Sequence, residues 1–430
     1  MSDLSQLVSA LRSLEDRLVS CNKCGFCMGT CPVFGQTLLE GDVSRGKLAL
    51  LSNFSQEILK DIDAVSARLS RCLLCGACQH TCPSGTETFD IFVRAREIIA
   101  AYKGLSPIKK LIFRHLLPHP RLLSFMMAAG SPFTGLVMPK DNNPQQTAQA
   151  PLLRRFIGRR HLPSVAGKTF ASEVGAQDTP AGKSGLRVAF FPGCMGDKAY
   201  LDMSRACLKV FRHHGVGVFM PADLVCCGLP ALTSGDTEAF TRLAVLNAQS
   251  LGRSHFDYIV TPCPSCTMTI RDLWGRYAAN LPEDARRIIA EIAPKAIDIN
   301  VFLVDVLKAV TPVEPDADAK TVTYHDPCHL RLSLACTAEP RTLLRANPGY
   351  RLTEMNEADR CCGCGGSFTL AEPALSEDIG SRKLNNIMAT NADVVATACP
   401  ACMMQISDML ARKGGKARVR HAVEVYAETL

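Results

Sequence analysis

Apolar residues recur along the chain with two different spacings. Near the N-terminus they follow the three- and four-residue steps of an amphipathic helix, as in Leu4, Leu7, Val8, Leu11, Leu14 and Leu18. From residue 187 onward, short continuous apolar runs typical of buried strands alternate with helical segments. The pattern predicts an α/β multidomain chain, with a mainly helical N-terminal region followed by layers that contain parallel strands.

The C-terminal part of the chain repeats itself at an offset of about 135 residues. Strands are predicted at 187–191, 215–219 and 258–261 in the first copy, and at 321–324, 350–355 and 393–397 in the second. A cysteine follows within a few residues of four of these runs: Cys194, Cys263, Cys328 and Cys399. Because parallel α/β proteins bind ligands at the carboxyl ends of their strands, each copy is expected to gather cysteines at one edge of its sheet.

Four segments follow from the pattern: 1–105, 106–186, 187–310 and 311–430. Residues 109–130 mix basic and apolar side chains and are predicted to be helical with a break near Pro118 and Pro120. Such helices would pack on the preceding domain or, as the alternative, form a membrane or partner surface. Residues 140–186 are rich in Pro, Gly, Ala, Ser and Gln, which is typical of a linker.

The chain has 21 cysteines, far more than ordinary usage. Its first residues lack the basic and apolar regions of a secretory signal, and no apolar run is long enough to span a membrane. A cytoplasmic location is therefore predicted, with peripheral contact at the inner face of the cell membrane left open. Since that compartment is reducing, the cysteines are expected to bind metal rather than to form disulfides.

Two cysteine runs share the bacterial ferredoxin spacing C-x2-C-x2-C-x3-C-P. In two-cluster ferredoxins the fourth cysteine of each run ligates the other cluster. We therefore assign one [4Fe-4S] cubane cluster to Cys21, Cys24, Cys27 and Cys82, and the other to Cys72, Cys75, Cys78 and Cys31. Zinc knuckles also use C-x2-C, but two complete runs favour iron-sulfur clusters.

Each C-terminal repeat carries five cysteines at nearly the same spacing. The first set is Cys194, Cys226, Cys227, Cys263 and Cys266, and the second is Cys328, Cys361, Cys362, Cys399 and Cys402. Adjacent cysteines form strained disulfides, and five ligands exceed the four of a structural zinc site. A redox iron-sulfur cluster is favoured in each repeat, with zinc or unmetallated thiols as the alternatives.

Five further residues near these sets are expected to be structural. Cys207 and Cys336 fit small core positions, and Cys364 is interpreted as a packing residue in preference to a spare ligand. His325 and His329 flank Cys328, where hydrogen bonding to cluster sulfur or proton transfer is the less favoured alternative.

The formal charge of +7 does not indicate a nucleic-acid partner. A cubane with four thiolates carries roughly −2, so several clusters offset most of the excess. No nucleic-acid-binding motif is present, and no G-x-G-x-x-G follows a strand. The chain is thus expected to have no flavin or nicotinamide site and no cofactor-binding residues beyond the cluster ligands.

The five-cysteine pattern resembles the cysteine-rich CCG domain, named for Cys-Cys-Gly as at 226–228 and 361–363. Heterodisulfide reductase has a subunit of that domain family, in which such cysteines hold a non-cubane [4Fe-4S] cluster. The whole chain, including Asp42-Val43-Ser44-Arg45-Gly46-Lys47, resembles the iron-sulfur subunits of glycolate oxidase and D-lactate dehydrogenase. Several members of the glycolate oxidase family lack cysteines in one CCG domain, whereas both are complete here.

The resemblance implies an electron-transfer subunit of an oxidoreductase, without catalytic residues of its own and inactive on substrate alone. It implies an FAD-containing dehydrogenase partner that oxidises glycolate or D-lactate, and a quinone or another downstream carrier as acceptor. It also implies one non-cubane cluster in each CCG domain. Three alternatives stay open: a heterodisulfide-reductase-like catalytic subunit, the iron-sulfur subunit of anaerobic glycerol-3-phosphate dehydrogenase, and a zinc-stabilised scaffold.

Overall fold

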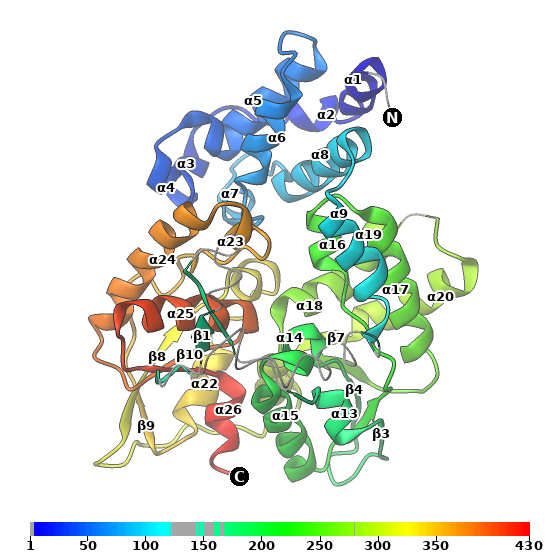
Figure 1. Cartoon of the computed structure of the whole chain (residues 1–430). Coiled ribbons are helices and arrows are strands. Elements are labelled where there is room, and N and C mark those ends of the chain that lie inside the picture. The colour runs from blue at the N-terminus through cyan, green and yellow to red at the C-terminus, as the bar shows by residue number, and fades with distance from the viewer. Residues whose placement is uncertain are drawn as a thin grey trace.

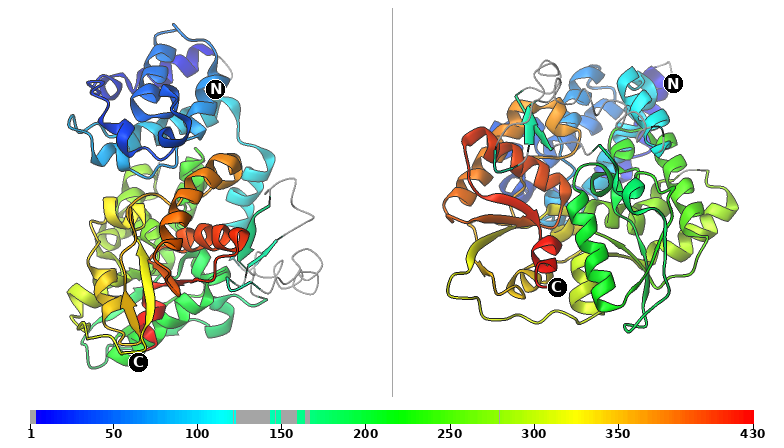
Figure 2. Two further views of the ribbon diagram at one scale, coloured as in Figure 1. Left: turned by 90° about the vertical axis from the view of Figure 1, so that its left-hand side faces the viewer. Right: turned by 60° about the horizontal axis from the view of Figure 1, so that its bottom comes forward.

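The computed structural model describes residues 4–120, 122, 143–145, 147–149, 159–163, 167–278 and 280–430. A helical unit lies at one end of the molecule, above two α/β modules that stand side by side (Figure 1). The left view in Figure 2 shows the same separation, with the C-terminus at the end of the molecule opposite the helical unit. This arrangement confirms the predicted order of a helical region followed by two α/β repeats.

The N-terminal unit is built from amphipathic helices around one apolar core. Its longer helices are α1 (Leu4–Arg12), α5 (Ser44–Ser55), α6 (Ile62–Ser70) and α8 (Thr88–Lys103). Leu7, Leu51, Phe54 and Phe92 are fully buried between them. The short elements are α2 (Glu15–Leu18), α3 (Phe26–Thr30), α4 (Phe34–Thr37), η1 (Glu40–Asp42) and α7 (Ala77–His80).

The first module contains a five-stranded sheet in the order β3-β5-β4-β6-β7. Its strands are β3 (Gln177–Asp178), β4 (Arg187–Phe190), β5 (Gly217–Met220), β6 (Tyr258–Thr261) and β7 (Ala296–Asp298). All neighbours pair in parallel except β3, which runs antiparallel to β5. Since β3 lies in the segment expected to be linker, that segment contributes an edge strand to this sheet.

The second module repeats this topology in a four-stranded, all-parallel sheet with the order β11-β10-β8-β9. Its strands are β8 (Lys320–His325), β9 (Tyr350–Leu352), β10 (Val394–Thr397) and β11 (Arg418–His421). The sequence pattern missed β7 and β11, because each is short and lacks a continuous apolar run.

Helices cover both sheets. Those of the first module are α14 (Gly193–Lys198), α15 (Leu201–His214), α16 (Leu229–Thr233), α17 (Thr237–Leu251), α18 (Pro264–Met268), η5 (Thr269–Leu273), α19 (Trp274–Tyr277), α20 (Glu283–Ile292), η6 (Ala293–Lys295), α21 (Ile299–Val301) and η7 (Phe302–Val306). Those of the second are η8 (His329–Ser333), α22 (Glu339–Arg345), α23 (Phe368–Ala371), α24 (Pro373–Met388), α25 (Pro400–Lys413) and α26 (Ala422–Ala427).

The two modules share one apolar core. Phe211 of α15 and Phe302 of η7 belong to the same buried cluster as Leu343 of α22 and Val423 of α26. The Lys209 ammonium of α15 also donates a hydrogen bond to the Ala427 carbonyl at 2.8 Å. The modules are therefore packed as one body, which fixes the position of one sheet relative to the other.

The segment between the helical unit and the modules is more ordered than a plain linker. It begins with α9 (Pro107–Lys110) and η2 (Leu111–Leu116), and the predicted helix beyond residue 122 lies outside the described residues. Further on, β1 (Thr147–Gln149) pairs antiparallel with β2 (His161–Pro163), and α13 (Phe170–Val174) follows. These elements pack against the modules, so the described residues of this segment contribute secondary structure and contacts to the fold.

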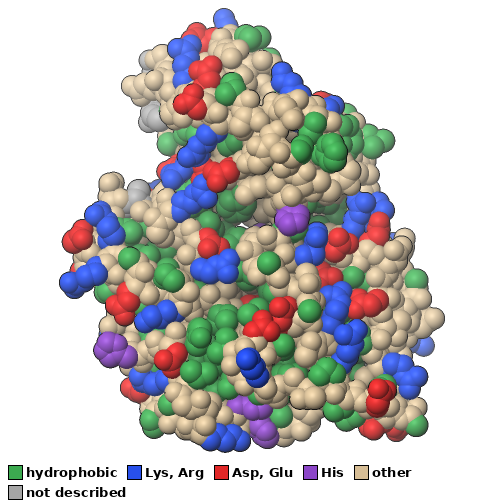
Figure 3. All heavy atoms as spheres, turned by 180° about the vertical axis from the view of Figure 1, so that it is seen from behind, with side chains coloured by type: hydrophobic (Ala, Val, Ile, Leu, Met, Phe, Trp, Pro, Cys, Tyr) green, Lys and Arg blue, Asp and Glu red, His purple; other side chains and the backbone are tan. Residues whose placement is uncertain are grey.

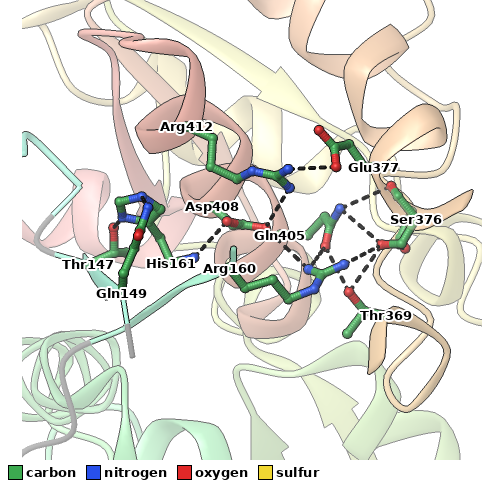
Figure 4. A network of polar contacts seen from close by, with 11 residues as sticks. Thr147, Gln149, Arg160, His161, Thr369, Ser376, Glu377, Gln405, Asp408 and Arg412 are labelled. Carbon is green, nitrogen blue, oxygen red and sulfur yellow. Dashed lines mark hydrogen bonds and ion pairs between the residues drawn. The ribbon is translucent and has the colours of Figure 1, made fainter. Parts of the chain in front are cut away.

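A buried arginine anchors this segment to the second module. Arg160 donates hydrogen bonds to Gln405 at 3.1 Å, to Asp408 at 3.2 Å and to Ser376 at 2.9 Å, as Figure 4 shows. The His161 backbone amide donates to the same Asp408 carboxylate at 2.8 Å. The segment is thus attached to α24 and α25 by charge and hydrogen bonds in the protein interior.

Candidate metal centres

The first ferredoxin-type set surrounds a small cavity in the helical unit. Cys21, Cys24, Cys27 and Cys82 all line it, so the fourth cysteine of the second run stands with the first three of the first run. Gly25, which precedes α3 and lines the cavity, has a φ of 88°, a left-handed conformation that glycine adopts without strain. Desolvation raises the pKa of Cys27, and a hydrogen bond to the Arg45 backbone partly offsets this.

The second set is arranged in the same way around a neighbouring cavity. Its lining includes Cys72, Cys75, Cys78 and, from the first run, Cys31. Burial raises the pKa of Cys78 to about 12. Lys47 lies beside this set and is almost fully buried, and its ammonium donates to the Asp42 carbonyl. A buried cation here offsets negative charge on bound thiolates.

The five thiols of each module lie near the carboxyl ends of the strands, in loops or in the first turns of the helices that follow. Cys194 follows β4, the Cys226–Cys227 pair precedes α16, and Cys263 and Cys266 lie at the start of α18. Thiol contacts connect these residues in the order Cys194, Cys226, Cys227, Cys266 and Cys263. The second module has the same order: Cys328, Cys361, Cys362, Cys402 and Cys399.

Protein contacts hold these loops in place. The Asn247 amide and the Trp274 indole donate to the carbonyls of Cys226 and Cys227 at 3.0 and 2.9 Å. Cys399 is the N-cap of α25, followed by Pro400 in the first turn. The positive end of that helix favours a thiolate at this position, and contacts with Cys263 and Cys402 help to hold the pKa of Cys399 well below its ordinary value.

The four sets of thiols are neighbours in space. Cys31 and Cys75 of the helical unit and Cys361 of the second module pack against one apolar cluster that contains Leu73 and Phe368. Cys399 of the second module interacts directly with Cys263 of the first. One series of thiols therefore runs from the helical unit through the second module to the first.

His329 joins the three parts of the molecule at this junction. Its Nε2 is 3.2 Å from the Leu74 carbonyl of the helical unit, and its Nδ1 is 2.8 Å from the Ser265 hydroxyl of the first module. Both ring nitrogens therefore have protein partners, as expected for a structural histidine.

Comparisons with known proteins match both the helical unit and the two modules. Residues 188–271 and 322–407 match the cysteine-rich domain family, and residues 17–86 match the 4Fe-4S dicluster domain. The probable glycolate oxidase iron-sulfur subunit of Bacillus subtilis is 29% identical, over 96% of this chain and 94% of its own. Lactate utilization protein A of Shouchella clausii is 32% identical, over 56% of this chain and 98% of its own.

The chain belongs to this family of CCG-domain iron-sulfur proteins. Another relative, a subunit of the fumarate reductase (CoM/CoB) of Methanothermobacter marburgensis, is 27% identical over 95% of this chain and 72% of its own. A hypothetical protein from Helicobacter pylori shares the fold, with a TM-score of 0.55 at 9% identity, over 100% of this chain and 76% of that one. The chain is an iron-sulfur, electron-transfer subunit of the oxidoreductase class.

The thiol sets fit the iron-sulfur groups that the family implies. All four sets offer thiol sulfur atoms that could hold such a group, with positive-φ glycines and a buried cation beside the ferredoxin-type sets. Of the cysteines outside the sets, Cys207 lies in the core formed with α15, and Cys336 packs beside Leu330. Cys364 is buried near Cys399 and Cys361, and burial raises its pKa to about 12. These surroundings are compatible with either role, and the packing role assigned to Cys364 stays a prediction.

His325 is the residue whose surroundings differ most from the sequence expectation. It is fully buried at the end of β8, and neither ring nitrogen has a hydrogen-bond partner. One of its nitrogens and the sulfur atoms of Cys362 and Cys402 all lie within 4.8 Å of one another. The Ala358 carbonyl lies near the ring, but it already accepts from the Lys383 ammonium and the Asp326 amide and makes no well-formed hydrogen bond with His325. Burial holds the pKa of His325 well below its ordinary value; Lys383 acts in the same direction, and the nearby Ala358 carbonyl opposes it.

On the face drawn in Figure 3, basic and acidic side chains are interspersed. None of the helices in the described ranges is both long and apolar enough to cross a membrane.

Proposed function

We propose that this chain is the electron-transfer subunit of a flavin-dependent 2-hydroxyacid dehydrogenase. An FAD-containing partner oxidises glycolate or D-lactate, and a quinone or another carrier receives the electrons. The observation that carries the proposal is the continuous series of four thiol sets, a construction suited to moving single electrons across the molecule. Iron-sulfur clusters bound there would supply the one-electron chemistry.

The ligand sets we propose combine the cavity linings with the crossed ligation of two-cluster ferredoxins, because Cys78 lines both cavities. Cys82 joins the first three cysteines of the first run, and Cys31 joins the first three of the second run. These two sets would hold two cubane [4Fe-4S] clusters. Each module holds one non-cubane [4Fe-4S] cluster through its five cysteines. The supporting observation is that the five thiols contact one another in the same order in both modules.

The exposed surface around Cys24 in the helical unit is the proposed docking surface for the flavoprotein. Cys24 is exposed there, and Phe26 and Leu38 keep 63% and 74% of their area exposed. Exposed apolar side chains beside a thiol ligand suit a partner that must approach the first cluster closely. Electrons then enter at Cys24 and leave the helical unit near Cys75.

A cavity of about 280 Å³ beside Cys72 is the proposed acceptor site. Its lining includes Arg96, Lys109, Ser234 and Phe368, a mixture of apolar and cationic groups that suits the head group of a quinone. Next to it, α9 and η2 expose Ile108, Leu111 and Ile112 among basic residues. We propose that this face contacts the membrane peripherally, which brings the cavity to its quinones.

Reconstitution with the flavoprotein tests the division of labour. The purified chain alone should not oxidise glycolate or D-lactate, and addition of the flavoprotein should allow substrate to reduce the clusters. Cys361→Ser and Cys362→Ser should then block transfer to the acceptor while substrate still reduces the flavin, and Cys207→Ser, a core cysteine outside the sets, is the control. Stopped-flow spectra follow flavin and clusters separately. Substrate oxidation by the flavin-free chain would overturn the proposal.

The acceptor site has a separate test. Lys109→Met should slow reoxidation of the reduced chain by quinone and leave reoxidation by a soluble inorganic oxidant unchanged. Lys110→Met is the matched control, because Lys110 is absent from the cavity lining. Equal effects of the two variants, or none, would remove the cavity from the pathway.

A further inference from the structure

The geometry around His325 matches that of a metal-binding group. The sulfur atoms of Cys362 and Cys402 are 3.5 Å apart, close to the separation of two thiolates on one tetrahedral metal ion. A ring nitrogen of His325 lies within 4.8 Å of both. Within the described part of the chain, no other histidine forms such a group with cysteines or carboxylates.

The ring of His325 lacks the partners that buried histidines normally have. His421 is equally buried, yet its Nε2 is 3.1 Å from the Pro262 carbonyl and its Nδ1 accepts from the Val423 amide at 3.2 Å. Among described residues, His325 alone contributes imidazole nitrogens to the buried polar atoms without a partner. A buried polar group without a partner loses its hydrogen bonds to water and gains none in return, so such a group calls for a ligand.

Comparison of the two modules shows that the feature belongs to only one of them. His325 precedes Cys328 by three residues at the end of β8, and Phe191 precedes Cys194 by three residues after β4. Both side chains are fully buried. An apolar ring is therefore sufficient for packing at this position, and the nitrogen atoms of His325 serve another purpose.

We propose that His325 is a nitrogen ligand of the metal group in the second module, on the same iron as Cys362 and Cys402. This rests on the proposed cluster in that module. Imidazole is a common iron ligand in proteins, and in Rieske centres histidine ligation of one iron shifts the potential of the whole cluster. The second module would then differ from the first in ligand set, and so in electronic structure.

Pulsed EPR of the iron-reconstituted full chain tests the proposal. The probe is the paramagnetic form of the second module's cluster, in protein grown with ¹⁴N- or ¹⁵N-histidine, so the first comparison needs no substitution. A histidine nitrogen coupling of the strength seen for direct ligands is expected. It should vanish in His325→Phe, which installs the residue of the first module, and persist in His329→Gln, because both nitrogens of His329 have protein partners.

Iron analysis of the same samples distinguishes a failure of the His325 ligand proposal from a failure of the cluster proposed in the second module. Wild-type chain with a full complement of iron but only weak nitrogen coupling would overturn the role of His325 alone. Ligand-strength coupling that survives His325→Phe would do the same. A second module that holds no iron would overturn the cluster proposed there, and this inference with it.

Discussion

At the scale of single residues, buried charge rather than apolar area fixes the segment before the first module. The Arg160 and Asp408 side chains keep only 6% and 2% of their area exposed, and burial raises the pKa of Asp408. A buried carboxylate of this kind depends on its guanidinium partner, because it cannot return to water in the folded protein.

Arg160→Ala is therefore expected to destabilise the second module by about 3 to 5 kcal/mol, the usual result of removing one partner from a buried ion pair. Arg159→Ala, at the exposed neighbouring position, should have little effect. Urea unfolding curves, recorded through the loss of cluster absorbance, compare the stability of the two variants. Similar midpoints for both would show that the network in Figure 4 contributes little to stability.

The crossed arrangement of the ferredoxin-type cysteines makes a second prediction at this scale. Cys31→Ser should disturb the cluster whose other ligands are Cys72, Cys75 and Cys78, since all four line one cavity. Cys24→Ser should disturb the other cluster. EPR of the reduced variants distinguishes the two signals, and a Cys31→Ser spectrum that matches that of Cys24→Ser would exclude crossed ligation.

At the scale of elements, α26 connects the modules and carries a buried acid. Glu424 lies on this helix, 3.3 Å from Arg420, and burial raises its pKa from 4.5 to about 7. Because the folded chain holds this proton more tightly than the unfolded chain, the carboxyl stabilises the fold fully below pH 4.5. That stabilisation is lost as the pH rises toward 7.

Glu424→Gln should remove this dependence. Relative to wild type, the variant should gain stability as the pH rises from 5 to 8, by up to about 3 kcal/mol, the equivalent of the pKa shift. Glu428→Gln is the control, because Glu428 also pairs with Arg420 but is more exposed. Urea midpoints measured across this pH range provide the test, and parallel curves for wild type and Glu424→Gln would contradict it.

At the scale of the whole molecule, four complete thiol sets predict the metal content. Anaerobically reconstituted chain should hold about 16 iron atoms and little zinc, since each of four clusters contributes four irons. Elemental analysis with acid-labile sulfide gives the answer. A reproducible value near eight iron with about two zinc would mean that the CCG modules are not redox centres.

Much of this architecture could be predicted from spacing alone. The cysteine runs imply cluster domains because a ligand set follows directly from intervals along the chain, and the apolar runs indicated the main parallel strands. Contacts between segments that are far apart in the sequence have no characteristic spacing, so the sequence pattern does not predict them. The burial of Arg160, the shared core of α15 and α26, and the unpartnered nitrogens of His325 depend on which surfaces meet. The one available signal for His325 was its alignment with Phe191 in the other repeat.

The contact between the two modules has the arrangement of a two-fold symmetric dimer, in which both partners use the same surface. Helix α15 of the first module packs on α26 of the second, and their counterparts, α22 and the α21–η7 segment, pack on each other. Such an isologous interface is what two identical subunits form. A protein with a single module would carry the same self-complementary face and would pair with a second copy of itself. Joining both copies in one polypeptide preserves the symmetric contact while allowing the residues around the two cysteine sets to differ, as Phe191 and His325 do.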